Sequence, residues 1–136
     1  MPGQESLAFE EDLRREARAL GLDFLAAFLE AAVGRRPELS EALAELGHVY
    51  TLLGRYEDGL RIDLLLVERF PGNPTVHYNL ACSLALLGRA DASLDALERA
   101  VECGYDDAHF MSTDEDLASV RDSARFQELA RRLREA

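Results

Sequence analysis

The chain has 136 residues and a formal net charge of −11, and 48% of its residues are hydrophobic. Such an acidic balance disfavours binding to nucleic-acid phosphates or to anionic lipid through a broad electrostatic patch. The length predicts one domain over residues 1–136, no apolar run approaches the roughly 18 residues that span a bilayer, and two cysteines make no disulfide framework.

Two helices separated by a glycine are predicted in the N-terminal part of the chain. Apolar residues recur every three or four positions over residues 6–20, which is the spacing of one helical face. This face consists of Phe9, Leu13, Ala17 and Leu20. Gly21 is expected to end the first helix, and residues 22–34 are expected to form the second.

The middle of the chain contains two copies of a 34-residue unit, residues 40–73 and 74–107. The block Leu-Leu-Gly-Arg at 52–55 recurs at 86–89. Each copy is predicted to be two helices around a turn, and Gly54 is expected to end the first helix in a left-handed conformation. The predicted buried faces are Leu43, Leu46, Tyr50 and Leu53; then Leu60, Leu64 and Val67, or alternatively Leu60, Asp63 and Leu66; then Leu80, Leu84 and Leu87; then Leu94, Leu97 and Val101.

The pattern changes over residues 108–136. Residues 112–115 form a capping-box sequence, which predicts the start of a short helix containing Leu117 and Val120. A final helix is expected to start at Asp122 or Ser123, with Phe126, Leu129 and Leu133 on its apolar side. Repeat proteins need a terminal cap with a polar outer face, and this segment fits that role.

These features together resemble the tetratricopeptide (TPR) family, whose helix–turn–helix unit has a period of 34 residues. The matching positions in the first copy are Leu43, Leu46, Gly47, Tyr50, Gly54, Tyr56 and Pro71. The second copy matches less well. The resemblance implies an all-α fold, an α-solenoid of antiparallel helix–turn–helix repeats with a C-terminal capping helix. Residues 6–39 are then either a degenerate repeat or a capping hairpin, and both alternatives predict the same burial.

The resemblance also implies a function, because TPR-like proteins usually bind other proteins. The expected ligand is a peptide or helix of a partner protein, held in a concave groove made by the first helix of each repeat, in an adaptor, scaffold or chaperone-like role. Tyr78 is the large aromatic residue expected to anchor the partner. The predicted groove residues are Arg15, Arg18, Glu41, Ala44, His48, Thr51, Leu52, Tyr78, Asn79, Cys82 and Leu86.

Catalytic and metal-binding motifs are not recognisable in the sequence. It contains no Gly-rich phosphate loop, Cys-x-x-Cys, His-Glu-x-x-His or Gly-x-Ser-x-Gly, so neither an enzyme nor a cofactor is expected. His48 and Cys82 occupy equivalent positions in adjacent repeats, but zinc needs three or four ligands, and the further candidates, Asp116 and Glu11, come from degenerate segments. We therefore expect no metal site.

Self-association through the N-terminal hairpin is the alternative function, because two good repeats have little surface with which to bury their faces. The N-terminus lacks the basic start and apolar stretch of a secretory signal, so a cytoplasmic protein is expected. All 15 basic residues are arginine, which is typical of high-GC bacteria.

Overall fold

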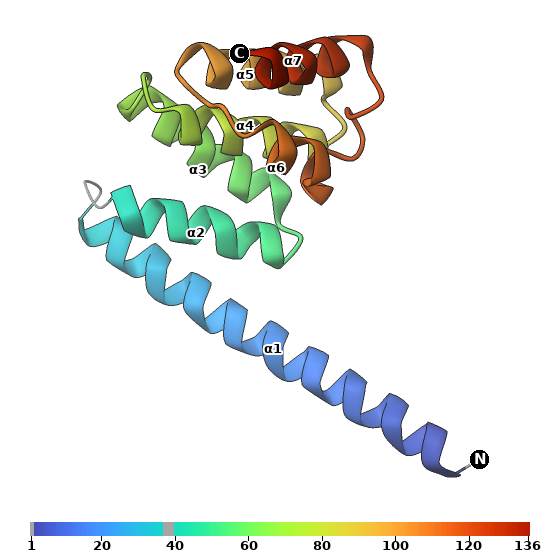
Figure 1. The fold of residues 1–136 in the computed structure, drawn as a ribbon. Helices are drawn as coiled ribbons and strands as arrows, with labels where there is room; N and C mark the ends of the chain where they lie inside the picture. The colour runs from blue at the N-terminus through green and yellow to red at the C-terminus, as the bar shows by residue number, and fades with distance from the viewer. Residues whose placement is uncertain (1, 37–39) are drawn as a thin grey trace. The chain divides into compact units, whose positions relative to one another are not determined.

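A computed structural model describes residues 2–36 and 40–136, without the side chains of residues 2–11, 13, 14 and 17. In this part of the chain all regular structure is helical (Figure 1). The elements are α1 (Pro2–Arg35), α2 (Ser40–Leu52), α3 (Tyr56–Arg69), α4 (Pro74–Leu86), α5 (Ala90–Glu102), α6 (Ala108–Thr113), the 3-10 helix η1 (Glu115–Leu117) and α7 (Ala124–Glu135). The fold is all-α, as expected.

The chain divides into two compact units, unit 1 (Met1–Arg55) and unit 2 (Tyr56–Ala136). The boundary between them falls at the turn that follows Gly54. It therefore lies inside the repeat at 40–73, between the two helices of that repeat. Among the described residues, no helix is both long enough and apolar enough to cross a membrane.

Unit 1 consists of one long helix, α1, and the shorter α2. The predicted break at Gly21 is wrong, because α1 continues through it without interruption. Gly21 keeps a negative φ, whereas Gly54 has a φ of 74°. A glycine inside a helix costs only about 1 kcal/mol relative to alanine, so without a proline or a new N-cap nearby it does not end the helix. Residues 6–34 thus form one continuous helix and no hairpin.

A Gly21→Ala variant distinguishes the continuous helix from the predicted hairpin. A Cβ at residue 21 would meet no atom within 4 Å, so the variant should stabilise α1 by about 0.5–1 kcal/mol. Far-UV circular dichroism of the full chain should show equal or greater helicity and a higher midpoint of thermal unfolding. Gly54→Ala is the control, which should destabilise because its φ is positive. Destabilisation by Gly21→Ala would instead support a turn at this residue.

The two helices of unit 1 pack through an apolar strip and one polar cluster. Leu43 and Leu46 of α2 and Ala26 and Leu29 of α1 are all buried. The Tyr50 hydroxyl donates a hydrogen bond to the Glu30 carboxylate. The guanidinium of Arg55 lies 3.7 Å from the same carboxylate and 4.5 Å from the centre of the Tyr50 ring. This cluster ties the end of α2 to α1.

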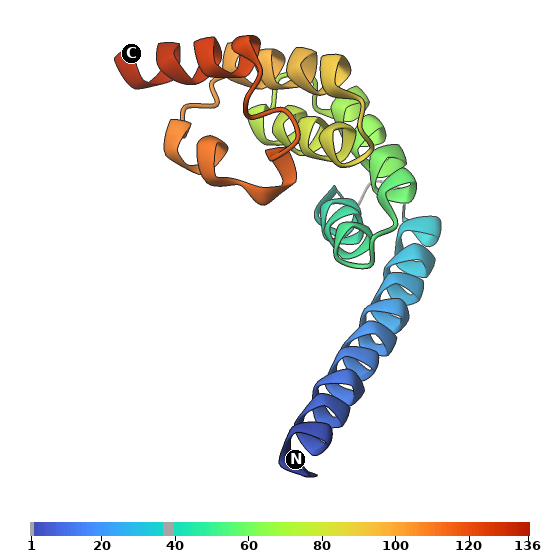
Figure 2. The same cartoon turned by 90° about the vertical axis from the view of Figure 1, so that its right-hand side faces the viewer.

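Unit 2 is built around α4, which packs against α3, α5 and η1. Asn73 caps its start, because the side-chain oxygen accepts a hydrogen bond from the Thr75 N–H at 2.8 Å. Gly88, with a φ of 75°, lies in the turn after it. Figure 2 shows α7 beside α5, and the α6–η1 segment on the other side of α4. The largest fully buried side chains of unit 2 are those of Phe126, Leu97, Met111, Leu117 and Leu129.

Most of the apolar faces predicted for the two repeats are buried, as expected, but the structure differs from the prediction in α3 and in the C-terminal segment. In α3 the buried alternative is Leu60, Asp63 and Leu66, while Leu64 is 51% exposed. Residues 108–113 form a helix that the sequence pattern does not predict. The short helix after it is a single 3-10 turn that ends at Leu117, before Val120. The final helix starts as expected, since Ser123 Oγ accepts a hydrogen bond from the Phe126 N–H at 3.2 Å.

Candidate partner-binding surfaces

Unit 1 presents one face of α2 to solvent. Glu41, Ala44, His48 and Leu52 are exposed and Thr51 is half-buried, with the Thr51 hydroxyl donating a hydrogen bond to the Gly47 carbonyl at 3.1 Å. These residues follow one another at helical spacing, opposite the buried Leu43 and Leu46 face. The structure therefore brings all the α2 residues predicted for a groove onto one accessible face.

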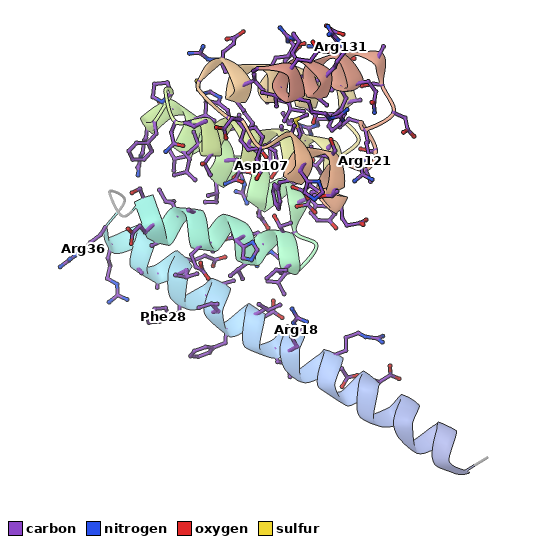
Figure 3. The ribbon with its side chains drawn as sticks, viewed as in Figure 1. Arg18, Phe28, Arg36, Asp107, Arg121 and Arg131 are labelled. Carbon is purple, nitrogen blue, oxygen red and sulfur yellow. The ribbon has the colours of Figure 1, made fainter. Side chains whose placement is uncertain are left out.

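A shallow open hollow of about 370 Å³ lies between α1 and the end of α2. Its lining residues are Arg15, Arg18, Ala19, Leu22, Leu52 and Leu53. Both arginines are exposed, and Arg15 lies 3.6 Å from the Asp12 carboxylate. The hollow joins an apolar floor to two guanidinium groups, and Leu52 belongs to both the hollow and the exposed face of α2. Figure 3 labels Arg18 in this region of α1.

In unit 2, the face of α4 that carries Tyr78 and Cys82 is covered by the chain itself. The Tyr78 ring stacks on Tyr105 at 4.5 Å between centroids and lies 5.9 Å from the Phe110 ring. Its hydroxyl donates a hydrogen bond to Asp114 Oδ2 at 2.7 Å. Burial, reinforced by this carboxylate, raises the pKa of Tyr78. The ring contacts and this hydrogen bond leave Tyr78 only 5% exposed.

Cys82 lies next to the same carboxylate. Its thiol is buried and directed at Asp114 Oδ2, 3.8 Å away. Burial, and then the charges of Asp114 and Asp116, raise the pKa of the Cys82 thiol, which keeps it protonated and unreactive. Of the remaining predicted groove residues, Asn79 is exposed and Leu86 is half-buried.

The ligand atoms of Cys82, Asp114 and Asp116 lie within 4.8 Å of one another. The sequence pattern indicates Asp116 as a candidate beside Cys82, but it does not indicate Asp114. Asp114, however, has a structural role that uses both oxygens: Oδ2 accepts from Tyr78, and Oδ1 accepts from the Asp116 N–H at 3.0 Å, which caps η1. His48 belongs to unit 1, and the Glu11 side chain lies outside the description. The expectation of no metal site stays a prediction.

A comparison with models of known protein families finds no match. Among curated proteins, a chloroplastic protein from Arabidopsis thaliana is 32% identical over 110 residues. The aligned region is 79% of this chain but 31% of that protein, so the chain spans less than a third of the relative's length.

Among solved structures, MamA (AMB-1), a TPR protein, superposes with a TM-score of 0.62 at 19% identity. The match covers 82% of this chain and 63% of MamA. The fold is TPR-like. This fold agrees with the 34-residue repeat in the sequence.

Helix α4 is the first helix of the second repeat, and the resemblance to TPR proteins predicted that its face with Tyr78 and Cys82 lines a groove. The prediction that they are presented to a partner is corrected, because residues of α6 and η1 and their flanks occupy that face. Ser119 extends the cover by donating a hydrogen bond to the Ala85 carbonyl at 3.1 Å, and Arg121 donates one to the Asp114 carbonyl at 2.8 Å. The α4 face of this TPR-like unit is therefore an internal packing surface.

One buried polar pair is not apparent from the sequence. The Ser83 hydroxyl of α4 donates a hydrogen bond to the carboxylate of Asp63 in α3, and both residues are buried. Burial raises the pKa of Asp63 to about 6, although the bond from Ser83 lowers it. The three-residue steps from Leu60 to Asp63 to Leu66 are a weak sequence signal for the burial of Asp63, and nothing local indicates its partner.

Proposed function

We propose that this chain is a non-enzymatic interaction module that binds a segment of a partner protein along the exposed face of α2 in unit 1. The observation that carries this is the continuity between that face and the hollow, which share Leu52. The expected role is that of an adaptor or scaffold, and a cytoplasmic location is part of the same proposal.

The chemistry of the surface indicates what the partner segment contains. Leu52 and Leu22 suit an apolar side chain, while Arg15 and Arg18 suit a carboxylate placed about one helical turn from it. Ala44 has a small side chain, which leaves room for the partner beside His48. A short peptide or a helix that carries an acidic residue near an apolar one meets these requirements.

Leu52→Ala should weaken binding to the partner by about tenfold or more, because an apolar contact at the centre of an interface often dominates its energy. The partner is first isolated from source-cell extract on the immobilised chain and identified by mass spectrometry. Its dissociation constant is then measured with purified components by isothermal titration. Arg18→Glu should weaken the same complex by reversing a charge.

Leu64→Ala is the matched control, since Leu64 is an exposed leucine of α3 in unit 2. It should leave the dissociation constant within about twofold of the parent. Equal losses for Leu52→Ala and Leu64→Ala, with unchanged melting, would show that the partner does not use the α2 face.

A further inference from the structure

Helix α1 carries a second apolar stripe on the side opposite the one that packs against α2. Leu20, Phe24 and Phe28 are 69%, 76% and 60% exposed. Figure 3 shows Phe28 projecting from α1 away from α2. The small residues Ala27 and Ala31 are also exposed and lie on the same stripe. An isolated exposed leucine is ordinary, but two phenylalanines and a leucine aligned on one helix indicate a binding surface.

The spacing of this stripe is that of a helix that pairs with another helix. Leu20 and Phe24 are followed seven residues later by Ala27 and Ala31. Steps of four, three and four residues from Leu20 to Ala31 are the pattern of a two-helix seam, which here runs for about 17 Å. The occupant that fits it is an α-helix.

The charges beside the stripe indicate the chemistry of that helix. Glu16, Asp23 and Glu30 follow one flank at intervals of seven residues, and all three are exposed. The Glu30 carboxylate already interacts with Tyr50 and Arg55. Glu16 and Asp23 therefore carry most of the negative charge that a docking helix would meet. A negatively charged flank beside an apolar seam attracts lysine or arginine at the facing positions of a partner helix.

A second copy of this chain fits the flank poorly. Two α1 helices in antiparallel pairing would bring their acidic flanks together, which is destabilising. In parallel pairing, Glu16 and Asp23 would face Gly21 and Phe28 of the other copy, so their charge would stay unneutralised. Each copy also carries a net charge of −11. An anionic membrane surface is disfavoured by the same flank.

We infer that the stripe formed by Leu20, Phe24, Ala27, Phe28 and Ala31 is a docking site for a basic amphipathic helix of another protein. Apolar residues of that helix occupy the seam, and its arginine or lysine side chains face Glu16 and Asp23. This site lies on the opposite side of α1 from the hollow, so it is separate from the surface described under the proposed function.

The test uses the full chain and two synthetic 21-residue helical peptides. Both peptides have leucine at the seam positions, and one has arginine where the other has glutamate at the flanking positions. Fluorescence anisotropy should show saturable binding of the arginine peptide and at least about tenfold weaker binding of the glutamate peptide. Phe24→Ala should weaken binding of the arginine peptide by about tenfold or more, and Asp23→Lys should do the same.

Phe110→Ala is the control, because Phe110 is an exposed phenylalanine of unit 2. It should leave peptide binding within about twofold of the parent, as should Leu52→Ala. Circular dichroism should show unchanged helicity for Phe24→Ala, since the side chain it truncates is exposed. Leu52→Ala thereby separates failure of this site from failure of the proposed function.

Three results would overturn the inference. Equal losses for Phe24→Ala and Phe110→Ala would show a general attraction of the cationic peptide to an acidic chain. A concentration-dependent rise in mass by light scattering that Phe24→Ala abolishes would assign the stripe to a second copy. Binding to vesicles of anionic lipid that Phe24→Ala abolishes would assign it to a membrane surface.

Discussion

Tyr78→Ala is expected to destabilise unit 2 by about 3–5 kcal/mol, the range measured for truncating large aromatic side chains in protein cores. The substitution removes the stack on Tyr105, the contact with Phe110 and the hydrogen bond to Asp114. It also opens a cavity between α4 and the segment that covers it. Urea denaturation of the full chain, followed by circular dichroism, measures the change in the free energy of unfolding.

Tyr78→Phe separates the hydroxyl from the ring. It keeps the stack on Tyr105 and removes only the bond to Asp114, so it should cost about 1 kcal/mol. Asn79→Ala is the neighbouring control on the exposed side of α4, and it should change stability by less than about 0.5 kcal/mol. A Tyr78→Ala protein that melts like the parent would mean that the α6–η1 segment does not pack on α4 in solution.

The burial of Tyr78 shows how much of the candidate site could be predicted from the sequence. Helical spacing placed Tyr78 and Cys82 on one face of α4, and both side chains do reach the same carboxylate of Asp114. The prediction that this face is exposed is wrong, because both residues are buried. The spacing could not show that Asp114, 36 residues beyond Tyr78, returns to that face. Such a contact depends on the path of α6 and η1, and these short elements have weak local signals.

The repeats were predictable because their signals are local and occur twice. The block that contains Gly54 recurs around Gly88, and both glycines adopt the positive φ that ends each first helix. Gly21 lacked such a second signal. Its neighbours favour a helix, and the modest cost of a glycine did not outweigh them. The prediction of two N-terminal helices therefore failed where it relied on one residue.

The incorrect break at Gly21 also explains why the exposed stripe on α1 was not predicted from the sequence. Leu20 was expected to lie on the buried face of a helix over residues 6–20 that folded back against residues 22–34. Because α1 is continuous, no such cover exists in the described part of the chain. The apolar pattern was thus visible in the sequence, but its availability to a partner was not.

Asp63→Asn is expected to change how the stability of unit 2 depends on pH. Burial raises the pKa of Asp63 from 3.8 to about 6. The folded protein therefore holds a proton that the unfolded chain releases near pH 4, and this favours the folded state at low pH. As pH rises through the window from about 4 to about 6, that contribution is lost, in total on the order of 3 kcal/mol.

The measurement is the difference in the free energy of unfolding between Asp63→Asn and the parent, taken by urea denaturation at pH 4, 5, 6 and 7. An asparagine carries no charge at any of these values, so the difference should shift in favour of the variant by on the order of 3 kcal/mol between pH 4 and pH 7. Comparing the two proteins at each pH removes the contributions of the other acidic groups, which are the same in both. The asparagine amide adds a constant offset and leaves this slope unchanged.

Ser83→Ala provides the second control, because it removes the hydrogen bond that lowers the pKa of Asp63. With that bond gone, the pKa should rise further and the loss of stability should extend to higher pH. If the parent and Asp63→Asn instead show parallel curves from pH 4 to pH 7, the Asp63 carboxylate titrates normally. It would then be reached by water in solution, and the packing of α3 against α4 around Ser83 would be looser than the structure has it.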